Sequence, residues 1–452
     1  MGNLFASIIS TDGSMRVISN GLNTVQSNIA NVSTPGYVKQ TQLFVAQAFD
    51  LRQGLPGGVA AGELISARNE YAERTVQQRQ QTAGAADQRV NDLAQIEPIF
   101  DLSPNSGISG AFSKFFQSFA QLAVSPNSAP ARQNVLDRAQ GVAAAFNQSS
   151  ADLGASAAAT DRELSAATSG VNRILDRLAT YNEEFRKSFE SSSDPGLDAN
   201  VHDALEQLSE LTNFTALKQA DGSYNILLAD QTPALVGSRV YPIALDTSGS
   251  QARILDAQGK DISAQFNTGR VGALLETRNT TIVSYRAELD TLAQTFADQV
   301  NNALSNGLDQ SGNPPGQALF AYNGISPAAT LSVNPLSASD IAASSFDAPG
   351  GNANALALAK LGSDKTINGF TFTEFYGNLA GRVGRDLSNA REESAARQSL
   401  LSQAKSLRQE VSGVSLDEEA AKLLQFQRSY QAAAKMVTVL NDLTDTLVGL
   451  IR

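Results

Sequence analysis

Apolar residues recur in steps of three and four near both ends of this 452-residue chain. Such steps place the side chains on one stripe of an α-helix, which is the pattern that a coiled-coil seam requires. The N-terminal set is Met15, Ile18, Leu22, Val25, Ile29 and Val32, and the C-terminal set is Leu423, Phe426, Tyr430, Ala433, Val437, Leu440, Thr444 and Leu447. A chain that begins and ends in such helices most simply folds back so that they meet.

The rest of the chain reads as mostly helical. Pro35 and Gly36 end the first helix, because proline disfavours helix at the residue before it and glycine permits a turn. The longest predicted helix starts at about Ala129 and ends at 191–196, and another runs from about 272 to 304. Both carry heptads, so we expect these two middle helices to pair.

The helical period is interrupted by short strand-like runs in one region. Asp221-Gly222 lies between two such runs and is a hairpin signature. Further on, Ser415 and Glu418 fit a capping box at the start of the last helix. The expected fold is mainly α, with a terminal coiled coil, a long-helix bundle in the middle and one small inserted β domain. The expected domains are an axial domain of 1–37 plus 413–452, a helical middle domain of 38–211 plus 267–412 with an extended connector at 38–67, and a β domain at 212–266.

Composition excludes several classes of function. The net charge of −11 makes nucleic acid a poor partner, and the absence of cysteine excludes disulfides and thiolate metal sites. No apolar run approaches the roughly 18 residues of a membrane span. The first residues lack the charged and apolar regions of a secretory signal peptide, so neither membrane insertion nor a cleaved signal is expected.

No catalytic or metal-binding constellation emerges from the residues. His202 is the only histidine, which excludes a histidine metal cluster or a Ser-His-Asp triad, and we expect it to be an ordinary, partly exposed helical residue. The adjacent acids Glu183-Glu184 point in different directions on a helix, so they read as a solvated face rather than a glycosidase pair. The chain is therefore expected to be neither an enzyme nor a cofactor-binding protein.

The terminal heptads admit two interpretations. Apolar three-four spacing usually marks a helix that faces its own core, and this is the preferred interpretation for the middle helices. The terminal helices have no obvious domain of their own to cover the stripe, so packing against other subunits is favoured there. The residues expected at the seam are Leu22, Val25, Ile29, Leu423, Phe426, Tyr430, Val437 and Leu440. Whether the contacts form within or between subunits stays open.

Both ends of the chain also carry recognisable motifs. Residues 28–37, Asn-Ile-Ala-Asn-Val-Ser-Thr-Pro-Gly-Tyr, resemble the N-terminal motif of the bacterial flagellar rod, hook and hook-associated proteins. Residues 412–420 and 425–435 are similar to the C-terminal signature of the same family. The motif residues carried over are Asn28, Asn31, Thr34, Pro35, Gly36 and Tyr37. The helical middle, with Arg270–Glu276, resembles the family members that join hook to filament.

This resemblance implies a structural role outside the cell. It implies unfolded export through the flagellar type III apparatus, and secretion to the hook–filament junction. It further implies a ring of about eleven copies of the chain. The implied partners are the hook protein, a second junction protein and a cytoplasmic export chaperone that holds the C-terminal helix. Alternatives are a hook or rod protein of the same family and, from a different class, a flagellar peptidoglycan hydrolase.

Overall fold

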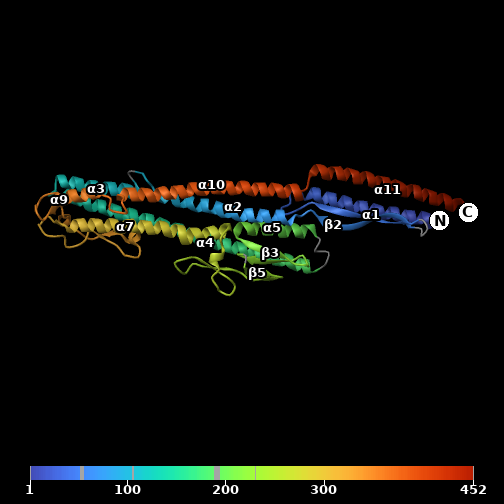
Figure 1. Ribbon diagram of the computed structural model, residues 1–452, viewed down its shortest axis with the longest axis horizontal. Coiled ribbons are helices and arrows are strands. Elements are labelled where there is room, and N and C mark those ends of the chain that lie inside the picture. Colours follow the sequence, from blue (N-terminus) through green and yellow to red (C-terminus); the bar gives the residue numbers. More distant parts are fainter. Residues whose placement is uncertain (1, 51–54, 104–105, 188–193, 230, 451–452) are drawn as a thin grey trace. The chain divides into compact units, whose positions relative to one another are not determined.

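The computed structural model describes residues 2–50, 55–103, 106–187, 194–229 and 231–450. Helices dominate these residues (Figure 1). They are α1 (Gly2–Ala30), α2 (Glu70–Ile96), α3 (Gly107–Val124), α4 (Ala129–Lys187), α5 (Pro195–Leu211), α6 (Gly269–Glu276), α7 (Ile282–Ser305), α8 (Pro327–Thr330), α9 (Ala353–Leu361), α10 (Phe372–Ser412) and α11 (Leu416–Leu450). The prediction of a mainly α fold with long terminal helices and a small β region is confirmed.

The strands are short, apart from the first two. They are β1 (Gln40–Asp50), β2 (Leu55–Ser66), β3 (Phe214–Lys218), β4 (Tyr224–Leu228), β5 (Thr232–Val236), β6 (Arg239–Val240), β7 (Ala244–Asp246), β8 (Arg253–Leu255), β9 (Gly307–Leu308), β10 (Phe320–Ala321), β11 (Ser332–Val333) and β12 (Ser344–Ser345). β3–β6 form one sheet in sequential order, and four two-stranded pairs are β1-β2, β7-β8, β9-β12 and β10-β11.

The chain divides into two compact units, each made of several segments. Unit 1 comprises Met1–Ala83, Gly170–Pro242 and Arg397–Arg452. Unit 2 comprises Gly84–Ser169 and Ile243–Ala396. Both chain ends therefore belong to the same unit.

Within unit 1, α1 and α11 run side by side, and the start of α1 lies beside the end of α11 (Figure 1). The predicted connector at 38–67 is more regular than expected. Its residues form the antiparallel hairpin β1–β2, whose register runs from Gln40 opposite Ser66 to Asp50 opposite Leu55. Strand pairing was missed because glycines and prolines mask the alternation that marks a strand. The hairpin lies along α1.

The four-stranded sheet of unit 1 is held by a buried amide on α4. Asn182 is 1% exposed; its Nδ2 donates to the Tyr224 carbonyl at 2.7 Å, and its Oδ1 accepts from the Tyr224 amide at 2.8 Å. The predicted turn at Asp221-Gly222 is confirmed, with Gly222 at φ +87°. The predicted end of α4 falls partly on residues 188–193, which lie outside the described residues. Asp194 caps α5, and Pro195 opens it.

Unit 2 is organised around a cluster of aromatic side chains. Phe112 and Phe115 of α3 meet Phe296 of α7, with ring centroids 4.8 and 5.4 Å from it. α4 contributes Val142 and Phe146 to the same core. The expected pairing of the two heptad-bearing middle helices is therefore corrected. The part of α4 that shares a core with α7 lies N-terminal to the predicted heptad, whose residues 171–185 belong to unit 1.

A π-helical segment, Thr277–Thr281, separates α6 from α7 where a single helix was expected. Asn279 in this segment pairs with the backbone of Ala252, accepting from its amide and donating to its carbonyl, both at 2.8 Å. This contact anchors the residues before β8. The strands expected as one β domain at 212–266 form two sheets, of which β3–β6 belong to unit 1 and β7–β8 to unit 2.

Two kinds of feature are absent from the described residues. None of the helices there combines the length and the apolar content that crossing a membrane requires. In the same residues, no three His, Asp or Glu side chains lie together as a metal site would need.

Candidate functional site

The N-terminal motif forms the turn that ends α1. The Thr34 amide donates to the Asn31 carbonyl at 2.9 Å, and the Tyr37 amide donates to the Thr34 carbonyl at 3.2 Å. The Asn31 side chain donates to the Ser27 carbonyl at 2.9 Å and accepts from the Thr34 hydroxyl at 3.1 Å. Pro35 lies exposed at the tip of this turn. The motif thus satisfies the Ser27 carbonyl in the last turn of the helix and reverses the chain.

Gly36 brings this turn against α5. It has φ +72°, and a Cβ at this position would lie 2.2 Å from the Ala199 carbonyl oxygen. Its own carbonyl accepts a hydrogen bond from Arg68 Nη2 at 2.7 Å. Both the left-handed backbone conformation and the close approach require glycine.

Asn28 joins the two ends of the chain. It is 1% exposed, and its Nδ2 donates to Glu419 Oε2 at 2.9 Å and to the Gln40 carbonyl at 2.9 Å. Its Oδ1 accepts from the Tyr37 hydroxyl and from the Gln40 amide, each at 2.9 Å. Asn28 therefore connects α1, the motif turn, the first residue of β1 and α11. We call Asn28, Tyr37, Gln40 and Glu419 the terminal lock.

Two lysines balance the charge of Glu419, the one acid of the lock, and one of them also binds the neighbouring Glu418. Glu419 is 0% exposed, and its Oε1 lies 2.9 Å from Lys422 Nζ and 3.9 Å from Lys39 Nζ. Lys39 also donates to Glu418 at 2.6 Å; this bond raises the pKa of Lys39 and lowers that of Glu418. Burial raises the pKa of the Tyr37 phenol. The predicted capping box is half formed, because the Ser415 hydroxyl accepts from the Glu418 amide at 3.4 Å while the Glu418 carboxylate binds Lys39.

A second set of buried charges lies beside Gly36. Arg68, whose side chain is 6% exposed, contacts Glu73 and Asp198, each at 2.6 Å. Glu73 also contacts Arg408 at 3.1 Å, and Arg408 contacts Glu206 at 2.7 Å. Burial opposes a charge on Glu206, but the hydrogen bond from Lys405 and the charge of Arg408 hold its pKa below the ordinary value. This network joins α2, α5 and α10 through the connector that follows β2.

His202 differs from the sequence expectation. It is buried rather than partly exposed, and its Nε2 lies 3.3 Å from the Tyr224 hydroxyl. Burial, reinforced by the charges of Arg68, Lys218 and Arg408, holds its pKa well below 6.5. The imidazole is therefore neutral at physiological pH. His202 belongs to α5, and its buried side chain faces Tyr224 of the β3–β6 sheet in the core of unit 1.

The predicted seam residues differ in how far they are buried. Val25 is 3% exposed, and Phe426 packs edge-on against Phe44 of β1 with ring centroids 5.7 Å apart. A Cβ at Gly21 would lie 3.1 Å from the Phe426 ring. The ring can pack this close to α1 because Gly21 has no side chain. The remaining predicted residues are half-buried Leu22, Ile29, Leu423, Val437 and Leu440, and Tyr430, which is 39% exposed. Their role in subunit packing stays a prediction.

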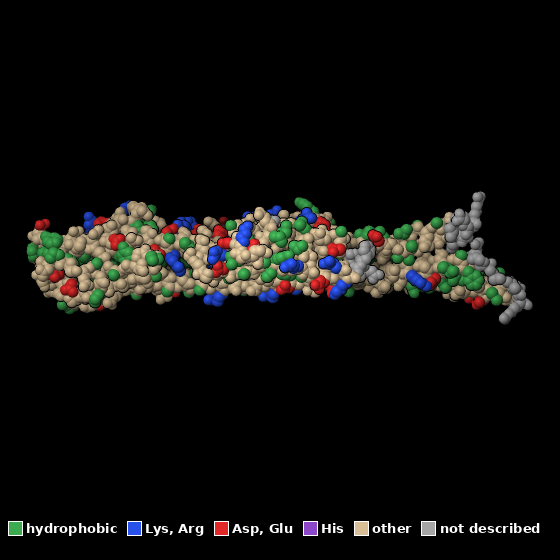
Figure 2. Space-filling view, turned by 90° about the horizontal axis from the view of Figure 1, so that it is seen from below, with side chains coloured by type: hydrophobic (Ala, Val, Ile, Leu, Met, Phe, Trp, Pro, Cys, Tyr) green, Lys and Arg blue, Asp and Glu red, His purple; other side chains and the backbone are tan. Residues whose placement is uncertain are grey.

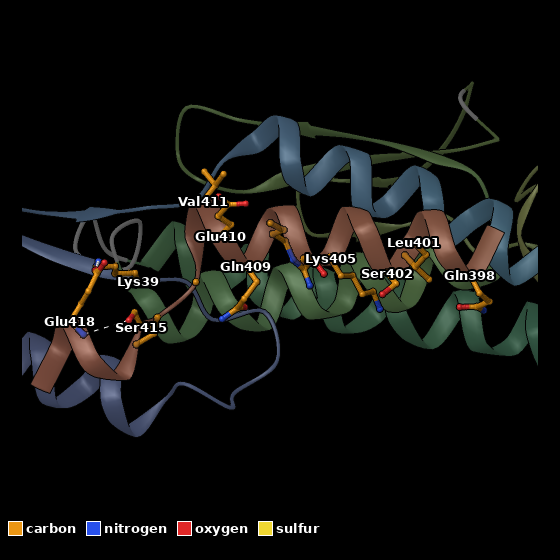
Figure 3. Close-up of a pocket in the computed structure, with 14 residues that line it drawn as sticks. Lys39, Gln398, Leu401, Ser402, Lys405, Gln409, Glu410, Val411, Ser415 and Glu418 are labelled. Atoms are coloured by element: carbon orange, nitrogen blue, oxygen red, sulfur yellow. Dashed lines mark hydrogen bonds and ion pairs between the residues drawn. The ribbon is translucent and has the colours of Figure 1, made fainter. Parts of the chain in front are cut away.

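A groove lies beside the lock where α10 ends and α11 begins (Figure 3). It has a volume of about 940 Å³. Figure 3 shows Lys39 and Glu418 near one end and the side chains of Gln398, Lys405 and Gln409 along α10. Lys39 and Lys405 are each paired with an acid, so the groove has no strong charge of its own.

Unit 1 leaves much apolar surface open around the terminal helices. Figure 2 shows hydrophobic side chains on the surface in several places along the face that it draws. The exposed large apolar residues of α11 are Leu416, Leu424, Tyr430, Met436, Val439, Leu443, Leu447 and Val448, and those of the hairpin are Leu43, Phe44, Val45, Phe49 and Ile65. Among them, Met436, Val439 and Leu443 follow one another at helical steps of three and four on a face of α11 other than the predicted seam.

Comparison with known protein families identifies the chain's relatives. A family model described as flagellar hook-associated protein FlgK helical domain matches residues 93–320. The chain belongs to the FlgK family of flagellar hook-associated proteins. A second family model, the C-terminal domain of the flagellar basal body rod FlgEFG proteins, matches residues 405–450 of this FlgK-family chain. The latter range includes Glu419 and the whole of α11.

Curated FlgK-family relatives match over almost the full chain. Flagellar hook-associated protein 1 of Bacillus subtilis strain 168 is 25% identical over 480 residues, covering 95% of this chain and 94% of that protein. The protein of the same name from Salmonella typhimurium is 23% identical over 542 residues, covering 95% and 97%. The flagellar hook junction protein FlgK from Burkholderia pseudomallei has a similar solved structure, with a TM-score of 0.67 and 18% identity over 74% of this chain and 99% of that chain. That likeness concerns the fold.

Glu419 was not among the predicted site residues, and Asn28 was predicted as a motif residue without its buried contacts. Glu419 is four residues before Leu423, so an acid occupies a heptad position of the C-terminal stripe. Asn28 lies at the end of the buried line formed by Val17, Gly21 and Val25. A polar residue at a heptad position is a signal for a buried polar contact, and it could have identified Glu419.

Proposed function

We propose that this chain is a structural subunit of the bacterial flagellum that forms the junction between hook and filament. It polymerises through its terminal helices. The observation that carries the proposal is the pairing of α1 with α11 in a chain similar, over 95% of its length, to proteins named flagellar hook-associated protein 1.

The surface of unit 1 supports polymerisation. Apolar side chains of α11 and of the hairpin are exposed, and contiguous exposed apolar surface generally marks an interaction site. In a ring of identical subunits, the same patch on every copy meets a different patch on its neighbour. The seam then holds each subunit's own helices together, while Met436, Val439 and Leu443 face a neighbour.

We propose one role for each of the domains expected from the sequence. Residues 1–37 with 413–452 act as the axial domain, and 38–211 with 267–412 act as the helical middle domain. Residues 212–266 add outer β structure and no catalytic function. The proposed partners are further copies of this chain, the hook protein, a second junction protein and an export chaperone at the C-terminal helix. The proposed location is extracellular, in the flagellum, after export without a cleaved signal.

A hook or rod protein is the second candidate. The similarity of residues 405–450 to the C-terminal domain of rod proteins favours it. The match of residues 93–320 to the FlgK helical domain favours the junction. The two candidates differ in which part of the flagellum is missing when the chain is removed.

Electron microscopy of cells that lack the gene tests the proposal, together with an assay of flagellin in the medium. Intact hooks without filaments, and flagellin released into the medium, are expected. Absent hooks would move the chain to the hook or rod, and normal filaments would contradict both candidates. Digestion of purified cell wall by the protein would overturn the non-enzymatic role.

A variant separates assembly from folding. Leu22→Asp with Ile29→Asp places two charges on the half-buried seam of α1. We expect a folded middle domain and no filaments. Global unfolding of this variant would contradict an axial role for the seam.

A further inference from the structure

The terminal helices touch at two layers whose positions define a register. Asn28 meets Glu419 in one layer, and Gly21 meets Phe426 in the other. The two α1 residues are seven apart, and so are the two α11 residues, in the opposite chain direction. The helices are therefore antiparallel, with each heptad of α1 opposite one heptad of α11.

Apolar heptads alone do not distinguish this register from its neighbours. A slip of seven residues moves each seam side chain to an equivalent heptad position of the other helix, so apolar contacts are replaced by similar ones. Leu22 and Ile29 on one side, and Leu423, Val437 and Leu440 on the other, fit either arrangement.

The polar layer does distinguish them. A slip in one direction places the Glu419 carboxylate opposite Gly21, in the apolar layer now filled by Phe426 and Phe44. A slip in the other direction places the Asn28 amide opposite the Phe426 ring. Either slip removes the bond between Asn28 and Glu419, and a buried carboxylate without its partner is strongly unfavourable.

We propose that the Asn28–Glu419 contact selects the register of α11 on α1, with Glu419 as a positioning residue. Lys422 and Lys39 compensate the buried charge in the native register. A consequence is that the contact decides how far α11 extends along α1 and the hairpin, because register fixes which residues of α11 lie beside which residues of α1. The inference concerns the single chain and holds whether or not the chain assembles as proposed above.

Cysteine cross-linking measures the register directly, because the chain has no cysteine of its own. Ser14 and Ala433 continue the two layers by another seven residues, so Ser14→Cys with Ala433→Cys reports the native register. Ser14→Cys with Leu440→Cys reports one slip, and Ser7→Cys with Ala433→Cys reports the other. Each full-length double-cysteine protein is oxidised when dilute. The fraction cross-linked within a single chain is read from denaturing gels.

Each cysteine pair is then combined with a substitution of Glu419 or of its neighbour Glu418. Glu419→Met removes the carboxylate at similar volume and leaves the bonds of Asn28 to Gln40 and Tyr37 in place. Glu419→Gln retains an acceptor for the Asn28 amide. Glu418→Met is the matched control, since that side chain is 60% exposed and is the immediate neighbour of Glu419 in the sequence.

We expect only the native pair to cross-link in the unchanged background, in Glu419→Gln and in Glu418→Met. In Glu419→Met the ratio of slipped to native cross-links should rise at least about tenfold, with helix content by circular dichroism retained. Exclusive native cross-linking in Glu419→Met would overturn the proposal, because the seam or the connectors would then set the register. Loss of helix content in Glu419→Met alone would also overturn it, because the contact would then hold the helices together rather than select their register.

Discussion

The backbone of Gly36 lies against the carbonyl oxygen of Ala199, so that a Cβ at Gly36 would be 2.2 Å from that oxygen. This contact brings the turn after α1 onto α5, at a residue with φ +72°. The glycine of the N-terminal motif therefore has a packing role that links the motif to unit 1 beyond the terminal helices.

Gly36→Ala is expected to destabilise the protein by about 2 kcal/mol or more, since it adds a steric clash to a left-handed backbone conformation. Urea unfolding followed by circular dichroism measures the change. Gly13→Ala is the control, because nothing lies within 4 Å of a Cβ in that helix and alanine is the better helix former. Equal stability of the two variants would contradict the packing role.

Arg68→Met is expected to destabilise the protein by about 3 kcal/mol, because it leaves the buried carboxylate of Glu73 and the half-buried carboxylate of Asp198 without their shared partner. Arg16→Met removes an exposed pair with Asp12 and should change stability by less than about 0.5 kcal/mol. Thermal and urea unfolding of both variants provide the comparison. A small effect of Arg68→Met would mean that water reaches these acids.

His202 makes stability depend on pH in a defined direction. Its pKa in the folded state is well below 6.5, so below pH 6.5 the unfolded chain binds a proton that the folded chain does not. Stability is therefore lost as pH falls. Between pH 7 and pH 5.5, the native protein should lose about 1 kcal/mol more than His202→Gln, measured by urea unfolding. Identical pH profiles would contradict a lowered pKa of His202, because they would mean that the imidazole binds a proton equally well in the folded and unfolded chains.

Met436→Asp with Leu443→Asp tests the exposed face of α11. These side chains are 58% and 48% exposed, so the free energy of unfolding of the single chain should change by less than about 0.5 kcal/mol. Assembly should fail, because two charges would enter a buried apolar contact. Swimming assays and electron microscopy of complemented cells give the result. Filaments of normal number would exclude this face from the subunit interface.

Much of the helical architecture could be predicted from the sequence. Periodicity and breakers placed α4 and the start of α11 close to their observed positions. The hairpin β1–β2 was missed because its pairing depends on the surface of α1, which supports a glycine-rich ribbon with weak alternation. The π-helical segment was missed because nothing in its residues marks the docking of Asn279 onto Ala252.

The sequence could identify the residues of the candidate site but not their partners. It identified the motif residues from Asn28 to Tyr37 and the apolar stripes. It did not pair Asn28 with Glu419, since these residues are 391 positions apart. It also placed His202 near the surface, because an isolated histidine on a helix carries no signal of a sheet packing over it.

By itself, the sequence determined that this chain is mainly helical, that both ends form amphipathic helices and that it resembles the axial proteins of the flagellum. These properties follow from local periodicity and from motifs of contiguous residues. Only the tertiary structure decided that Asn28, Tyr37 and Glu419 form one buried site, that Gly36 packs on α5, and that α11 keeps a second apolar face exposed. The physical reason is that burial and hydrogen bonding depend on which distant segments meet, and local sequence does not encode that choice residue by residue.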